Sequence, residues 1–270
     1  MPGSDGKQSA AADRPAAAQE PAAKAYIGDP EDPATWKLPV EAYLPTKAEA
    51  RLMSSSRDDV IKQCMADAGF PDWQPAPDLP TVGGTTLTDW RYGIHDLALA
   101  KQNGYHPDSE QQAANEAALA SDESMNADQD ILRSCASKTD DTGASVQHSP
   151  LVNQINGSSY QQSTESAAVK KVFALWSACM KAKGYTYREP LDASDSFSAG
   201  SDEISEAEKQ TAVADVGCRD QHHVEKTWFE AEAAIQQKAI AGRLDHLKLQ
   251  KDAIKSAVAK ARSTSEEAVR

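Results

Sequence analysis

Apolar residues recur at helical spacing in several segments of the chain, and each segment is bounded by glycine, proline or a polar stretch. The pattern predicts one helix that ends at Gly69 and another that ends at Gly184, because glycine adopts the left-handed conformation that closes a helix. A proline-containing loop follows each. Two later helices carry Ile131 to Cys135 and Val213 to Cys218. The pattern therefore predicts an all-α fold.

Two of these segments resemble each other. Asp58 to Phe70 and Phe173 to Tyr185 both read Cys-Met-x-x-x-Gly-aromatic, and each is followed by a loop and a second cysteine-bearing helix. We interpret this as an internal repeat, with a first helical unit over residues 31–140 and a second over residues 161–235. The first unit carries an insertion rich in aromatic residues and histidine.

The four cysteines are Cys64, Cys135, Cys179 and Cys218. Zinc sites usually draw ligands from closely spaced cysteine pairs, which this chain lacks, so two disulfides are the better interpretation. The repeat favours the pairs Cys64–Cys135 and Cys179–Cys218, although four cysteines permit three pairings. Disulfides imply an oxidising compartment. We therefore expect an extracellular or cell-surface protein, tethered or secreted.

Two stretches have the composition of flexible segments. Residues 1–30 begin with Ala, Pro, Gly and Gln and almost no large apolar side chain, which predicts a disordered tether. Residues 141–160 are polar and predict a linker. Asn156-Gly157-Ser158 in this linker matches a glycosylation acceptor, but an Asn-Gly turn is the plainer explanation.

The C-terminal part predicts a long helix. From about residue 205 to 261 there is no proline, and the only glycines are Gly217 and Gly242. Leu247, Ile254 and Ala261 lie seven apart, as in a coiled coil. We expect residues 236–270 to form a projecting, coiled-coil-like helix that binds a protein partner. The alternative is a helical hairpin or a solvated helix that packs on its own head.

The formal net charge of -13 disfavours nucleic acid and anionic membranes as partners. No apolar run reaches the roughly 18 residues of a membrane span, and no signal peptide follows Met1. Either the chain is cytosolic or an export signal, with any lipid anchor, was removed before residue 1. The cysteines favour export.

The insertion in the first unit holds the residues best suited to bind a ligand. Two imidazoles, a carboxylate and three aromatic rings lie close in sequence and could line a pocket or support acid–base chemistry. The plainer explanation is that the rings fill the core of the unit and the histidines lie at helix ends. These residues are Trp90, Tyr92, His95, Asp96, Tyr105 and His106.

A second candidate is a metal site. Cys218, His222 and Glu225 lie at i, i+4 and i+7 on one helix face, a spacing that can present metal ligands. An oxidised Cys218 could not ligate, so we expect neither a metal nor another cofactor. The common motifs of metalloproteases, α/β-hydrolases, nucleotide-binding loops and EF-hands are absent from the sequence.

The chain resembles a group of exported proteins of unknown function from actinobacteria, mainly of the Streptomyces type. The resemblance covers roughly residues 36–235 and rests on the two repeat segments and on three further elements: Leu38-Pro39-x-x-Ala42-Tyr43, Arg91-Tyr92-Gly93-Ile94 with Asp96, and Gly104-Tyr105-His106-Pro107. It implies a secreted protein or lipoprotein, and some such proteins are encoded beside ABC exporters and their adaptor subunits. This chain departs from the group in lacking a lipobox cysteine.

Together these features predict a non-enzymatic extracytoplasmic binding or accessory protein, associated with an envelope transport complex or the cell wall. The alternatives are a small-molecule binder that uses the insertion from Trp90 to His106, and a hydrolase with no recognisable motif.

Overall fold

The computed structural model describes residues 21–142, 149–197 and 204–268. Within these ranges the chain is helical, and its β pairing is limited to an isolated bridge between Tyr26 and Lys37. The predicted all-α class is confirmed. The α-helices are α1 (Lys47–Asp67), α2 (Leu97–Asn103), α3 (Ser109–Ala120), α4 (Gln129–Thr142), α5 (Pro150–Thr164), α6 (Ala167–Ala182), α7 (Pro190–Asp195), α8 (Glu206–His222), α9 (Val224–Ala241) and α10 (Leu244–Ala268). Three short 3-10 helices are η1 (Pro33–Thr35), η2 (Pro39–Tyr43) and η3 (Ser124–Asn126).

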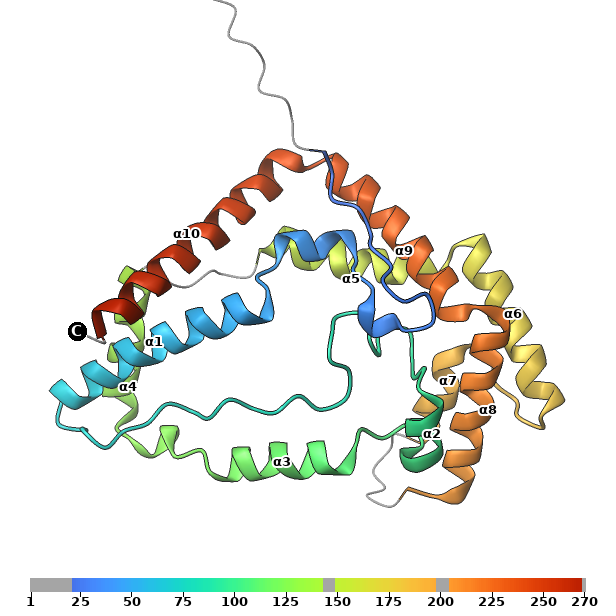
Figure 1. Ribbon diagram of the computed structural model, residues 1–270, viewed down its shortest axis with the longest axis horizontal. Coiled ribbons are helices and arrows are strands. Elements are labelled where there is room, and N and C mark those ends of the chain that lie inside the picture. The colour runs from blue at the N-terminus through green and yellow to red at the C-terminus, as the bar shows by residue number, and fades with distance from the viewer. Residues whose placement is uncertain (1–20, 143–148, 198–203, 269–270) are drawn as a thin grey trace, which may run out of the picture.

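The helices form an open triangular arrangement (Figure 1). Helices α9 and α10 make two of its sides and meet near Gly242, and α3 lies along the base. One corner is a head built from α2 and α5 to α9, and the opposite corner is an arm built from α1, α4 and the end of α10. None of the described helices has a stretch apolar enough to cross a membrane.

The main core lies in the head and is rich in aromatic rings. The Trp228 ring packs against Phe173, Tyr160 and Tyr92, with centroid separations of 4.9, 5.2 and 5.4 Å. Trp36 packs on Phe229 at 5.1 Å. Aromatic pairs at these separations add attraction beyond the area that they bury. These contacts join the segment before α1 and the insertion around Tyr92 to helices of the second unit, so the two predicted units share one core.

The arm has two smaller cores. Helix α1 begins with a capping box in which Thr46 accepts from the backbone N–H of Glu49 and Glu49 accepts from that of Thr46. One face of α1 packs on α10 through Met53, Ile254 and Val258. Another packs on α4 around the disulfide of Cys64.

Both predicted disulfides are confirmed, as Cys64–Cys135 and Cys179–Cys218. The disulfides indicate an oxidising, extracytoplasmic environment. The repeated helix ends are confirmed as well: Gly69 and Gly184 have φ of 97° and 94°. The following aromatic residues, Phe70 and Tyr185, each donate their backbone N–H to the methionine carbonyl five residues earlier.

The predicted C-terminal helix is present as α10, but the expectation that it runs unbroken from about residue 205 and projects is wrong. The segment divides into α8, α9 and α10, with the first break at His223, whose backbone is left-handed, and the second at Gly242 and Arg243. The seven-residue stripe of Leu247, Ile254 and Ala261 is buried as expected. It is buried within the chain itself: Leu247 belongs to the core of the head, and Ile254 and Ala261 are buried where α10 folds back onto α1.

Two predicted flexible segments also differ from the structure. Residues 21–30 of the predicted tether are placed against the head, where Ala25 and Ile27 pack on the core; residues 1–20 lie outside the described residues. In the predicted linker, residues 150–160 belong to α5, which buries Val152 and Ile155. Asn156-Gly157 is therefore helical and the expected turn is wrong; residues 143–148 are not among those described.

Candidate functional site

The six candidate ligand-binding residues of the insertion do not converge on one pocket, and three of them hold the insertion against the helices of the head. The hydroxyl of Tyr92 donates to Glu232 at 2.8 Å, and that of Tyr105 donates to Asp215 at 3.1 Å. His106 lies 3.5 Å from a Glu208 oxygen. These three residues face carboxylates of α8 and α9.

The other three of the six have local roles. Asp96 caps α2 by accepting from two backbone N–H groups, and the Trp90 ring packs on Gly83. His95 forms a 2.8 Å hydrogen bond to Asp89, which also accepts from the backbone N–H and hydroxyl of Thr85. Only His95 of the six lines the pocket described below.

Arg219 is the centre of the most deeply buried charge cluster. Its side chain is 1% exposed and donates to Asp215 at 2.6 Å and to the Pro190 carbonyl at 2.9 Å. It also donates to the Tyr92 carbonyl and lies 3.4 Å from Glu225. A buried guanidinium needs such partners because its desolvation is costly. The cluster ties α8, α9 and the insertion together.

A second buried cluster surrounds Glu232 on α9. Arg91 from the insertion forms two hydrogen bonds with this carboxylate, at 2.6 and 2.9 Å. Ser159 and Gln236 donate to it as well, at 3.1 and 3.0 Å. Most of these contacts join different segments of the chain, so both clusters stabilise the fold, and Glu225 of the first cluster also lines the pocket described below.

The metal candidate is not assembled. Cys218 is in the disulfide with Cys179, and Glu225 lies beside Arg219, so His222 is left without the other two proposed ligands. No set of three His, Cys, Asp or Glu side chains suited to a metal ion occurs in the described parts of the chain.

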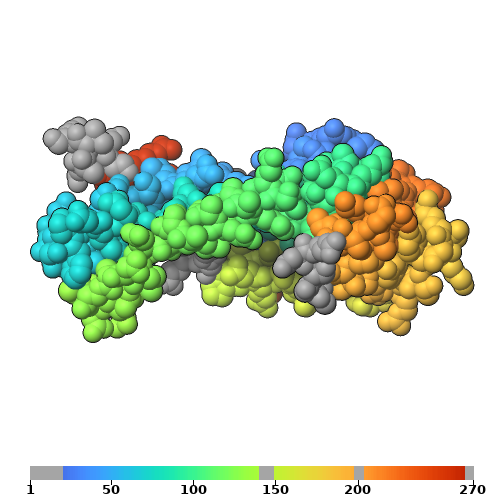
Figure 2. All heavy atoms as spheres, turned by 90° about the horizontal axis from the view of Figure 1, so that it is seen from below, coloured from blue at the N-terminus to red at the C-terminus, as the bar shows by residue number. Residues whose placement is uncertain are grey.

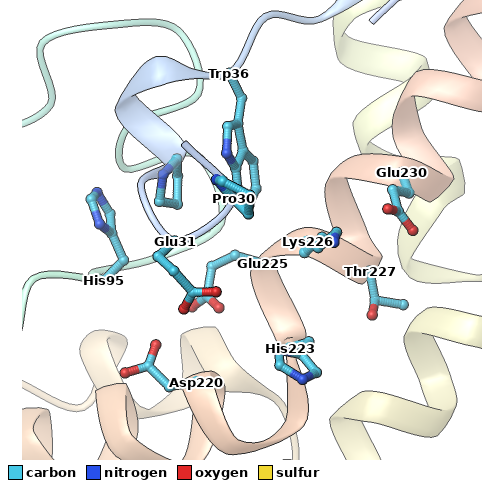
Figure 3. Close-up of a pocket in the computed structure, with 11 residues that line it drawn as sticks. Pro30, Glu31, Trp36, His95, Asp220, His223, Glu225, Lys226, Thr227 and Glu230 are labelled. Atoms are coloured by element: carbon cyan, nitrogen blue, oxygen red, sulfur yellow. The ribbon is translucent and has the colours of Figure 1, made fainter. Parts of the chain in front are cut away.

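The best candidate for a functional site is an acidic pocket of ≈180 Å³ at the junction of α8 and α9. Its floor and walls come from three distant segments: the turn before Trp36, the insertion at His95, and the α8–α9 junction. Figure 3 shows the Glu31 and Glu225 side chains reaching into the same region, with the Asp220 carboxylate below them and His223 to the right. The lining residues are Pro30, Glu31, Pro33, Trp36, His95, Asp220, His223, Glu225, Lys226, Thr227 and Glu230.

Two carboxylates of this pocket, those of Asp220 and Glu225, are in surroundings that disfavour their charged form. Burial raises the pKa of Asp220, and the negative charge of Glu31 raises it further, against the opposing effect of His95 and His223. Burial also raises the pKa of Glu225, although Arg219 acts in the opposite direction. The lining holds four carboxylates, those of Glu31, Asp220, Glu225 and Glu230, against one lysine, Lys226, and this is an excess of negative charge.

The backbone at His223 places this residue at the mouth of the pocket. It has φ 51° and ψ 46°, the left-handed conformation, and is the only non-glycine residue with positive φ in the described chain. That conformation costs a non-glycine residue about 1–2 kcal/mol. It ends α8 and starts α9 in a new direction, which brings Asp220 and Glu225 to the same opening.

Sequence reasoning missed Glu31, Asp220 and Glu230. The sequence around each of these residues is charged and contains no motif. Only the fold of the α8–α9 junction brings them together. Comparison of this chain with protein-family models, with curated proteins and with solved structures found no match.

Proposed function

We propose that the protein is an extracytoplasmic binding protein that acts without catalysing a reaction, and that the acidic pocket holds the cationic group of its ligand. The observation that carries the proposal is the convergence of Glu31, Asp220 and Glu225 on one cavity. Like charges that face each other across a partly buried space repel, and a cation between them would remove that repulsion.

The dimensions of the pocket favour a small group. A volume of ≈180 Å³ is below the roughly 300–1,000 Å³ of pockets that enclose a drug-sized molecule. An ammonium or guanidinium head group, on a small molecule or on the side chain of a partner, is the ligand chemistry that suits it. Trp36, Pro30 and Pro33 supply an apolar wall for the carbon atoms next to the charge.

The surroundings of the titratable groups support binding over catalysis. His95 is engaged by Asp89, and Glu225 lies beside Arg219. Thr227 is the one hydroxyl among the lining residues, and the lining includes no serine or cysteine. A hydrolase needs an activated nucleophile or water held by a base of suitable geometry.

The proposed place of action is the cell envelope, with the protein secreted or anchored by a lipid. The two disulfides support export, and the resemblance to exported actinobacterial proteins supports a role near a transport complex or the cell wall. Fractionation of cells that produce the native protein tests this part. Recovery from the cytosol with four free thiols would contradict it.

The binding proposal is tested by isothermal titration calorimetry with guanidinium, methylammonium and L-lysine, and with acetamide as an uncharged control. We expect the cations to bind and acetamide not to bind. Asp220→Asn and Glu31→Gln should each weaken binding by about tenfold, since each removes a full charge from the site. Asp245→Asn, an exposed carboxylate at the start of α10, should leave binding unchanged.

Equal weakening by the Asp245 variant would show that the cations respond only to the net charge of the protein. That result, or the absence of binding by any of the three cations, would overturn the proposal. Binding of L-lysine but of neither small cation would still support the pocket as the binding site. It would indicate a ligand that also contacts the apolar wall.

A further inference from the structure

Helix α3 is unusual because it buries none of its residues. A helix of 12 residues is marginal in water on its own, and helices in proteins are mostly stabilised by packing of an apolar face. Figure 2 shows α3 as a ridge across the face of the molecule seen from below. Its surface is therefore available to a partner.

The extended segment of residues 71–84 runs beside α3. The backbone N–H of Gly83 donates to Gln111 at 3.2 Å, and the Asn115 amide donates to the Pro80 carbonyl at 3.0 Å. These two contacts fix an antiparallel alignment of helix and segment. Leu119, one turn after Asn115, and Leu79, next to Pro80, accordingly lie toward the same end of α3.

Large apolar side chains are exposed on this pair of segments and on η3, which follows α3. Leu79 is 52% exposed, Leu119 52%, Met125 64% and Val82 37%. We refer to these four residues, with the acidic residues named next, as the α3 face. Exposed apolar groups gathered beside an unburied helix mark an interaction surface.

The two segments that form the α3 face carry charge of a single sign, and the neighbouring basic residues Lys62, Arg57 and Arg133 lie only near the Gln74 to Leu79 part. Residues 71–84 and 108–128 contain eight carboxylates and no lysine, arginine or histidine. Within the described structure, none of the eight takes part in an ion pair. The carboxylates are Asp72, Asp78, Asp108, Glu110, Glu116, Asp122, Glu123 and Asp128.

We propose that the α3 face is the docking surface for a basic amphipathic helix of a partner protein. An apolar stripe on that helix would cover Leu79, Leu119 and Met125, and flanking lysines or arginines would pair with the carboxylates. A second copy of this chain is disfavoured, because a symmetric contact would oppose the same carboxylates. This proposal is independent of the acidic pocket, whose residues lie in other segments.

The test uses the full chain and a synthetic peptide about four helical turns long, with leucines at helical spacing and lysines elsewhere. A peptide of the same composition with its leucines scattered is the control for charge alone. Binding is measured by fluorescence anisotropy of the labelled peptide. We expect the amphipathic peptide to bind at least about tenfold more tightly than the scattered one, and salt to weaken both.

Variants locate the contact. Leu119→Ser with Met125→Ser should reduce affinity for the amphipathic peptide by about tenfold or more, because two apolar contacts are lost. Both residues are exposed, so the fold should survive. The matched control is Leu249→Ser on α10, which removes another leucine, 70% exposed, outside the α3 face. It should leave the affinity unchanged.

Glu110→Gln with Glu116→Gln should lower the affinity of both peptides and flatten the salt dependence. The proposal would be overturned if the two peptides bound equally, or if Leu249→Ser weakened binding as much as the α3 variant. It would also be overturned if the protein formed a dimer that the Leu119 and Met125 variant abolished, since a second copy would then cover this face.

Discussion

Arg91 and Glu232 lie 141 residues apart in the sequence and form a two-point ion pair in the centre of the head, with the Glu232 side chain fully buried. Tyr92, Ser159 and Gln236 complete the hydrogen bonding of the same carboxylate. The Arg91 guanidinium also lies 4.9 Å from the centre of the Tyr160 ring. The pair joins the insertion of the first unit to a helix of the second.

Removing one partner of this pair should be far more harmful than removing both. Arg91→Met leaves a buried carboxylate without its counter-ion and should lower the free energy of unfolding by about 3–5 kcal/mol. The double variant Arg91→Met with Glu232→Met should recover part of that loss. Urea denaturation followed by circular dichroism measures both. A double variant less stable than the single one would contradict the assignment of Arg91 as the essential counter-ion.

Replacing two of the glycines by alanine should change the stability of the protein in opposite directions. Gly157 is in the middle of α5 with open space around it, so Gly157→Ala should raise the free energy of unfolding by about 0.5–1 kcal/mol. Gly93 has φ of 110°, and a Cβ there would collide with the Arg219 guanidinium. Gly93→Ala should therefore destabilise the fold, by at least the roughly 1–3 kcal/mol of such backbone strain. Thermal unfolding of the two variants, side by side, checks the contrast.

The disulfides should each contribute substantially. They join residues 71 and 39 apart, for which the chain-entropy model gives about 4 kcal/mol each. Replacing either pair by serine should lower the free energy of unfolding by about that amount. Loss of Cys64–Cys135 should also expose α1 and α4 to limited proteolysis before the head is cut. If the protease cut the arm and the head at the same rate, the arm would not unfold separately from the head, and this prediction would be wrong.

The stability of the protein should depend on pH through Asp220. Because the pKa of this carboxyl is raised in the folded state, folding retains a proton that the unfolded chain releases. The contribution of Asp220 to the free energy of unfolding therefore falls as the pH rises from the ordinary pKa of the carboxyl to its raised pKa in the folded state. Asp220→Asn removes this loss and should make the protein more stable than wild type near neutral pH. The difference should disappear below about pH 4. Urea denaturation from about pH 3.5 to 7 measures it, and a difference independent of pH would contradict the explanation.

Local patterns in the sequence were sufficient to predict the helical class, both disulfides and the glycine-terminated repeat. Gly69 and Gly184 act through their own helix ends, and such local effects are visible in sequence. The pairing of Cys64 and Cys179 with distant cysteines followed from the repeat. The burial of the stripe containing Leu247 and Ile254 was also predictable, but the surface that covers it was not. Periodicity shows that a face is buried without showing which element buries it.

Apart from the disulfides, long-range features could not be predicted. His223 breaks the helix in a conformation that is uncommon for a residue with a side chain, so propensity favoured continuity through it. The polar composition of residues 150–164 concealed a helix whose serines hydrogen-bond to buried groups, as Ser163 does with Trp228. The pocket follows from that break at His223, and its carboxylates Glu31, Asp220 and Glu230 carry no sequence signal.

The claim that the acidic pocket binds a cation is tested most directly by a crystal structure of the protein crystallised in the presence of guanidinium. The account predicts a guanidinium ion in the acidic pocket, within hydrogen-bonding distance of Asp220 and of Glu31, and its absence from crystals of the Asp220→Asn variant. An empty pocket in crystals whose other surface carboxylates hold the ion would contradict the assignment of this pocket as the binding site.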